Sequence, residues 1–229
     1  GVTATVVVPT NNALDKNAAM RALGAELIEV GHDFNAAKQV AEELAAERNL
    51  HMVDSFHRDL VLGVSTYGDE LLRAAGELDV VFVPIGLGSG ICGVITARDL
   101  LGLKTRIIGV VPERANSYAL SFASKHPVSI NKADTIAEGI AVRHPHPDAV
   151  RFINSGAADV VEVSDASIRD ALRTLYNTTH NVAEASGAAA LAALMQEKEK
   201  YAGKRVGVIL SGGNIDASKL TDILSDHVA

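Results

Sequence analysis

The sequence predicts an α/β protein with open, mostly parallel sheets and helices on both faces. Short apolar runs rich in β-branched residues alternate with longer segments of helical apolar spacing along almost the whole chain. The helical segments are long enough to join parallel strands, which require crossover connections. Glycine-rich turns at strand ends or helix starts complete the pattern, since this is where such sheets bind ligands.

In the first part of the chain, we expect strands at residues 3–8, 26–30 and 51–53. Pro9 ends the first strand, and Gly31 ends the second. Helices are expected at residues 14–23, 34–48 and 60–75. Gly24 is placed to end the first of them in a left-handed conformation. The second helix has apolar residues at helical spacing, namely Phe34, Ala37, Val40, Ala41 and Leu44.

The second part begins with the apolar run at Val80, which we expect to be a buried strand. Further strands are expected at residues 106–111, 160–163 and 205–210. Helices are expected from the glycine turn through Leu101, over residues 165–178 with Asp165 as N-cap, over 183–200, and from about Ala217. Residues 113–146 are expected to be less regular.

Composition and charge exclude several classes of protein. A net charge of −7 without a Lys/Arg block argues against nucleic acid as a partner. Cys92 is the one cysteine and has apolar neighbours, so we expect a buried side chain rather than a nucleophile. No apolar run reaches the ~18 residues of a membrane span, and no signal peptide is recognised. We therefore expect a cytoplasmic protein without a membrane partner.

The turn at residues 86–93 is the leading candidate for a binding site. Glycine lets the backbone approach a ligand closely, and free N–H groups at a helix start favour a phosphate. The alternative is a tight turn from strand to helix that binds nothing. Other glycine-bearing turns occur at residues 184–187 and 211–214, and a polar corner at 135–139. Together with Glu184 and Ser211, they predict an anionic ligand with a polar ring.

A dinucleotide-binding enzyme is the rival interpretation, since residues 88–93 match G-x-G-x-x-G between a strand and a helix. That motif requires an acidic residue at the end of the next strand. Here the strand ends in Val111-Pro112, and Glu113 arrives only after the proline. An NAD site would also leave residues 211–214 without a role.

Five segments, in the same order, resemble the threonine/serine dehydratase and serine racemase family. These are pyridoxal-phosphate enzymes of fold type II, which the tryptophan synthase β subunit shares. The segments are residues 15–26 (DKNAAMRALGAE), 83–86 with the glycine loop, 135–142 (TIAEGIAV), 184–191 (EASGAAAL) and 210–216 (LSGGNID). The resemblance covers nearly the whole chain.

The resemblance implies pyridoxal 5'-phosphate as cofactor. The phosphate would bind at Gly86, Leu87, Gly88, Ser89 and Gly90, although Leu87 and Ser89 replace two glycines of the family.

Around the ring, Ser211 would meet the pyridine nitrogen, Glu184 would lie near the ring, and the Gly139 backbone would pass its edge. A helix N-cap for Ser211 and a first-turn carboxylate for Glu184 are the alternatives without a ligand.

The family binds its cofactor on a lysine in a Ser-x-Lys-x-Arg-Gly segment, which does not occur in this chain. We therefore assign no catalytic residue here, expect an N-terminally truncated chain, and expect no turnover from it alone. Residues 1–58 would form an incomplete small α/β domain, and residues 59–229 the large cofactor-binding domain.

For the intact enzyme, the resemblance implies an ammonia-lyase (dehydratase) that converts L-threonine, L-serine or a similar 3-hydroxy amino acid to a 2-oxo acid and ammonia. A racemase of the same family is the alternative. We expect a homo-oligomer, dimer or tetramer, and no metal site. Val111 and Ser117 stand where serine racemases place carboxylate ligands, and His144 and His146 are expected in an exposed loop.

Overall fold

The computed structural model describes residues 1–225. The chain divides into two compact units, each described here by itself. Unit 1 contains Gly1–Asp54 and the chain from Asn214 onward, and unit 2 contains Ser55–Gly213. Every residue that the sequence predicts for the cofactor site therefore belongs to unit 2.

Unit 1 contains a small parallel sheet of two strands, β1 (Thr5–Val8) and β2 (Glu26–Glu29). Its helices are α1 (Leu14–Ala22), α2 (Phe34–Glu47) and α9 (Ala217–Ser225). Gly24 follows the cap of α1 with φ of +86°, which confirms its predicted left-handed conformation. The strand predicted at residues 51–53 is wrong, because these residues pair with no described strand and Val53 is 68% exposed.

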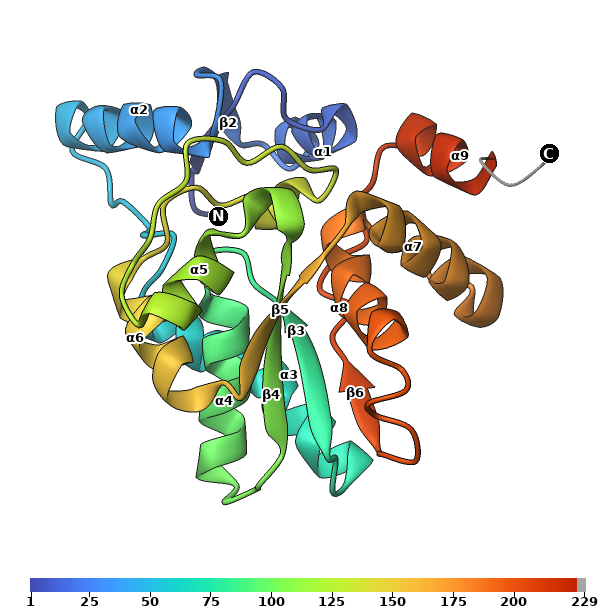
Figure 1. Ribbon diagram of the computed structural model, residues 1–229. Helices are drawn as coiled ribbons and strands as arrows, with labels where there is room; N and C mark the ends of the chain where they lie inside the picture. Colours follow the sequence, from blue (N-terminus) through green and yellow to red (C-terminus); the bar gives the residue numbers. More distant parts are fainter. Residues whose placement is uncertain (226–229) are drawn as a thin grey trace. The chain divides into compact units, whose positions relative to one another are not determined.

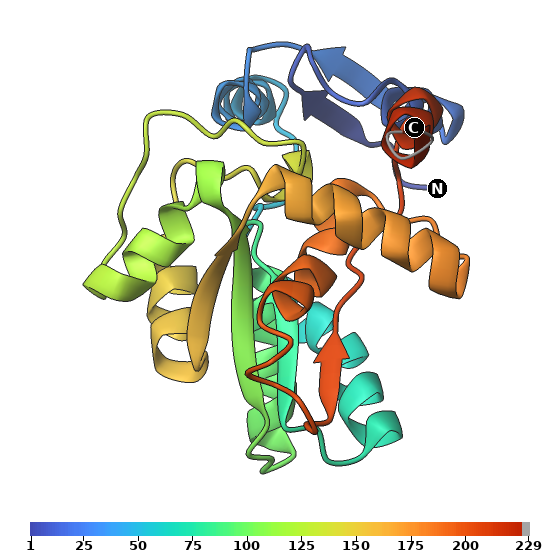
Figure 2. The same ribbon diagram turned by 45° about the vertical axis from the view of Figure 1, so that its right-hand side comes forward.

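Unit 2 is organised around a parallel sheet of four strands in the order β5-β4-β3-β6 (Figure 2). The strands are β3 (Val80–Pro84), β4 (Arg106–Pro112), β5 (Asp159–Val163) and β6 (Val206–Val208). All three pairings are parallel, so the carboxyl ends of the strands share one edge of the sheet. The predicted fold class, parallel sheets with helices in α/β order, is confirmed.

The helices of unit 2 are α3 (Arg58–Ala75), α4 (Ser89–Leu100), α5 (Ser117–Ser124), α6 (Pro147–Gly156), α7 (Asp165–Thr179) and α8 (Ala185–Gln196). Short 3-10 turns, η1 (Glu113–Ala115) and η2 (Glu138–Ile140), lie between β4 and α6. The sequence did not predict α5 and α6. Figure 1 shows α3 and α4 on one face of the sheet and α8 on the other. None of the helices within residues 1–225 combines the length and apolar character needed to cross a bilayer.

Alternation along β3 separates two apolar layers. Val81 and Val83 belong to the core cluster that includes residues of α3, α4 and α6, whereas Phe82 packs edge-on against Tyr201 at 5.3 Å between ring centroids. Helix α8 buries a run of small residues and packs on β3, β4 and β5. Small side chains let that helix approach the sheet closely.

The prediction that Asp165 is the N-cap of α7 is wrong. Ser164, not Asp165, caps the helix, and its side chain accepts the N–H of Ser167. The Asp165 carboxylate instead accepts the hydroxyl of Thr135 and the backbone N–H of Ile136. The corner at residues 135–139 is thereby tied to the first turn of α7.

Candidate functional site

The glycine loop lies between the end of β3 and the start of α4. The N–H of Ile85 still bonds the carbonyl of Val110 on β4, so the loop leaves the sheet directly after a paired residue. Gly88 is the N-cap of α4 and has φ of +104°, a conformation that glycine adopts without strain. Its carbonyl accepts the N–H of Cys92 in the first turn of the helix.

Six consecutive backbone N–H groups, from Gly86 through Ile91, make no hydrogen bond to any residue of the described part of the chain. Gly88 is buried, and Gly86, Leu87, Ser89 and Gly90 are half-buried. Unpaired N–H groups in such a position are costly unless a ligand or water accepts from them. Because the last three also begin a helix, the donor set suits an anion such as a phosphate.

The corner at Gly139 lies directly against this loop. A Cβ on Gly86 would lie 2.8 Å from the carbonyl oxygen of Gly139, so Gly86 must be glycine for the contact to exist. The N–H of Gly139 donates to Ser186 Oγ at 2.9 Å, and Ser186 is only 4% exposed. Sequence reasoning gave Ser186 no role, although it lies inside one of the recognised segments.

Glu184 connects the corner to the turn after β6. Its backbone N–H donates to the carbonyl of Gly212 at 3.0 Å. Its Oε1 lies 2.7 Å from the position of a Cβ on Gly212 and 3.6 Å from that of a Cβ on Gly139. Glu184 is the N-cap residue of α8, and its side chain makes no cap hydrogen bond to that helix.

Ser211 lies beyond the end of β6 and next to Gly212. The N–H of Ile209 bonds the carbonyl of Phe82, which extends the pairing of this segment with β3. Ser211 is exposed, and α9 begins only at Ala217, so Ser211 is not the N-cap of that helix. The loop after β3, the Gly139 corner, Glu184 and the Ser211 turn thus form one continuous set of contacts at the carboxyl edge.

Other residues with possible chemistry lie outside this set. Cys92 is fully buried, and burial raises the pKa of its thiol to about 12, which agrees with a structural side chain. His146 accepts the N–H of Asp148 at the start of α6, and His144 contacts Ser129. Among residues 1–225, no three His, Cys, Asp or Glu side chains are grouped for a metal ion.

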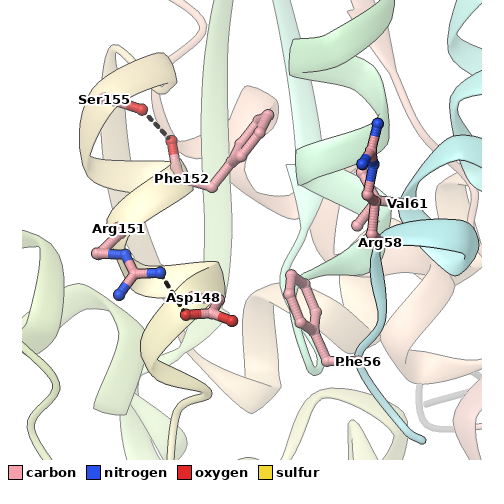
Figure 3. A pocket seen from close by; sticks show the side chains of 7 residues that line it. All are labelled: Phe56, Arg58, Val61, Asp148, Arg151, Phe152 and Ser155. Carbon is pink, nitrogen blue, oxygen red and sulfur yellow. Dashed lines mark hydrogen bonds and ion pairs between the residues drawn. The ribbon is translucent and has the colours of Figure 1, made fainter.

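A surface pocket between α3 and α6 is separate from the glycine loop (Figure 3). Phe56, Arg58 and Val61 face Asp148, Arg151, Phe152 and Ser155 across it. The Arg151 and Asp148 side chains pair with each other on the rim. None of the residues predicted for the cofactor lines this pocket.

The fold and the loop define an α/β protein in which backbone N–H groups without a partner among the described residues lie at the carboxyl edge of a parallel sheet, a donor set that suits a phosphate. The family model of the pyridoxal-phosphate dependent enzymes matches residues 1–212. The chain therefore belongs to this family, and its cofactor is pyridoxal phosphate. The predicted resemblance is confirmed, and the NAD interpretation is wrong.

Curated relatives are about one third identical to this chain over the aligned residues. L-threo-3-hydroxyaspartate ammonia-lyase of Saccharomyces cerevisiae is 33% identical over 225 residues, which are 98% of this chain and 69% of the relative. Phenylserine dehydratase of Ralstonia pickettii is 34% identical over 220 residues, 95% of this chain and 67% of the relative. L-threonine ammonia-lyase of Thermotoga maritima is 30% identical over 226 residues, which are 98% of this chain and 56% of the relative.

Solved structures match the fold closely. The processed form of threonine deaminase isoform 2 from Solanum lycopersicum has a TM-score of 0.89 at 32% identity, covering 96% of this chain and 65% of that chain. Maize serine racemase has a TM-score of 0.88 at 26% identity, and the match covers 99% of this chain and 70% of the maize chain. This chain thus spans about two thirds of the tomato enzyme. The relatives bear out the predicted class, a pyridoxal-phosphate-dependent lyase of hydroxy amino acids, with racemases among the structural neighbours.

Proposed function

We propose that the backbone N–H groups of Gly86, Leu87, Gly88, Ser89 and Gly90 hold the phosphate of pyridoxal phosphate. The observation that carries this proposal is the set of six unpaired amides, which continues to Ile91 at the start of α4. Backbone donors and a helix N-terminus suit a dianion without any need for a lysine or arginine.

The ring is proposed to lie between the Gly139 corner and the turn after β6. When bound, the cofactor draws off the electron pair that remains when the Cα–H bond of an amino acid breaks. Ser211 offers a neutral hydroxyl to the pyridine nitrogen, which does not keep that nitrogen strongly protonated. Gly139 presents backbone rather than a side chain, and Glu184 places a carboxylate beside it.

The proposed reaction removes water and then ammonia from a 3-hydroxy amino acid. The Cα proton leaves first, the hydroxyl departs from Cβ with the bonding electrons, and water then replaces the nitrogen to give a 2-oxo acid and ammonia. The names of the relatives support threonine, 3-hydroxyaspartate and phenylserine as the substrates to compare.

The lysine that binds the cofactor is proposed to lie outside residues 1–229. Support comes from coverage, since 98% of this chain matches only 69% of the yeast relative. Borohydride reduction with pyridoxal phosphate then leaves no specific adduct on one lysine of this chain. Mass spectrometry showing a stoichiometric adduct at a single lysine would contradict the proposal.

The activity is tested on the protein with the family's lysine segment present, by following 2-oxo acid formation from each of the three amino acids. Release of ammonia in equal amount supports the lyase. Inversion at Cα without 2-oxo acid would favour the racemase, which the maize neighbour represents by name.

We further propose a cytoplasmic homo-oligomer, dimer or tetramer, with no bound metal and no nucleic-acid partner. The net charge of −7 and the buried free thiol of Cys92 agree with this. Light scattering and metal analysis of the purified protein test the two structural points, and cell fractionation tests the location.

A further inference from the structure

The glycine loop is contacted by the hydroxyls of two tyrosines from different helices. Tyr118 on α5 donates its hydroxyl to the carbonyl of Leu87 at 2.8 Å. Tyr67 on α3 donates to the carbonyl of Gly90 at 3.2 Å. Both acceptors are carbonyls of the segment whose N–H groups are unpaired. The Leu87 carbonyl precedes α4, so the Tyr118 bond orients a peptide plane outside the helix. Gly90 lies in the first turn of α4, and the Tyr67 bond there adds to the orientation that the helix provides.

The Tyr118 hydroxyl has two partners, and the Leu87 carbonyl can only accept from it. The backbone N–H of His146 donates to the same hydroxyl oxygen at 3.2 Å. A phenol has a single proton to give, and that proton therefore goes to Leu87. Tyr118 is 2% exposed, and burial raises the pKa of its hydroxyl. Burial also raises the pKa of Tyr67, to about 12. Both hydroxyls therefore keep their protons and remain donors at neutral pH.

Peptide geometry links these carbonyls to the anion site. The described peptides are trans, so the N–H of Gly88 points opposite to the carbonyl of Leu87, and the N–H of Ile91 opposite to that of Gly90. If either plane turned over, a carbonyl oxygen would take the place of an N–H donor and repel a phosphate. Gly88 has no side chain to resist such a rotation.

We propose that Tyr118 and Tyr67 are positioning residues that keep the Leu87 and Gly90 carbonyls turned away from the bound phosphate. The inference rests on the proposed phosphate site and adds what keeps its donors aligned in the absence of ligand. Neither tyrosine belongs to the segments by which the family is recognised, and both act on the phosphate only through the loop backbone.

The test compares Tyr118→Phe and Tyr67→Phe with Tyr201→Phe. Tyr201 is a matched control because it is a buried tyrosine, packs on Phe82 and has no hydrogen-bond partner for its hydroxyl within the described residues. Each variant loses one oxygen and keeps its ring, and urea unfolding checks that it is folded. Binding of inorganic phosphate is measured by titration of the amide NMR spectrum, with pyridoxal phosphate as a second probe.

Loss of one aligned hydrogen bond should weaken phosphate binding about tenfold for Tyr118→Phe and about threefold for the longer Tyr67 bond. Tyr201→Phe should bind as the wild type does. Wild-type affinity in folded Tyr118→Phe and Tyr67→Phe would overturn the inference while leaving the proposed function intact. If phosphate does not shift the amide signals of residues 86–91 in the wild type, both the inference and the proposed phosphate site are wrong. Should Tyr118→Phe fail to fold, Tyr67→Phe decides alone.

Discussion

The carbonyl oxygen of Gly139 lies 2.8 Å from the position that a Cβ on Gly86 would occupy. Two segments more than fifty residues apart in the sequence thus meet through backbone alone. No side chain separates the end of the β3 loop from the corner that Asp165 ties to α7. A cofactor bound by the loop amides therefore lies next to that corner without any rearrangement of unit 2.

Replacing Gly88 by alanine should destabilise the protein and prevent phosphate binding. Its φ is +104°, and a Cβ would lie 2.7 Å from the Cβ of Ala149. The strained backbone and the clash each cost about 1–3 kcal/mol. Gly63→Ala is the control, because its Cβ would meet nothing within 4 Å in helix α3, and it should stabilise by about 0.5–1 kcal/mol. Urea unfolding measures the stability of both variants. Equal changes in the free energy of unfolding for Gly88→Ala and Gly63→Ala would contradict the role of Gly88.

Removing the Asp165 carboxylate should loosen the corner that carries Gly139. Asp165→Ala leaves the hydroxyl of Thr135 and the N–H of Ile136 without their acceptor, at a cost of about 1–3 kcal/mol. Asp148→Ala is the control, since its pair with Arg151 is exposed and worth less than about 1 kcal/mol. Hydrogen exchange at Gly139 should quicken only in the first variant. An unchanged rate there would show that Asp165 does not order the corner.

Cys92 should resist thiol reagents in the folded protein. Its side chain is 0% exposed, and burial raises its pKa to about 12, so only about one thiol in 10⁴ is ionised at pH 8. Ellman's reagent is expected to react at the rate of unfolding in buffer and at once in 6 M guanidinium. Rapid stoichiometric labelling of the native protein would contradict the buried assignment.

Stability should fall at alkaline pH in the window set by the buried hydroxyl of Tyr67. Its pKa is raised from 10.0 to about 12, so the folded state holds the proton more tightly than the unfolded state. This contribution is complete below pH 10 and is lost as pH rises toward 12. Urea midpoints between pH 8 and 11.5 should drop more steeply in the wild type than in Tyr67→Phe. Parallel curves would show that Tyr67 titrates as it does in the unfolded chain.

Patterns in the sequence predicted the elements that carry strong local signals. The continuous apolar run predicted β3 as a buried strand, helical apolar spacing predicted α2, and Gly24 ends α1 through its own φ. Helix α6 also has a local signal, Pro147 in its first turn directly after His146, although no helix was predicted there. Helix α5 has only eight residues, with serines through its length, and its buried Tyr118 bonds the glycine loop, a tertiary contact that local pattern does not show.

The residues of the candidate site also divide into those that the sequence indicated and those that only the tertiary fold brings together. Glycine turns at strand ends indicated the loop and the Ser211 turn, and recognition of the family supplied the roles of Glu184 and Gly139. Contacts between distant segments were beyond local pattern, since they depend on the tertiary fold. Ser186 accepting from Gly139 and Tyr118 donating to Leu87 are of this kind.

The central claim is that the free amides of residues 86–91 bind the cofactor phosphate. Titration of ¹⁵N-labelled protein with pyridoxal phosphate, and with inorganic phosphate beside it, tests this most directly. The account predicts that both ligands move the amide signals of Gly86, Gly88 and Gly90 most strongly and slow their exchange with water. Shifts that cluster instead around Phe56 and Phe152, or none in the glycine loop at saturating ligand, would contradict it.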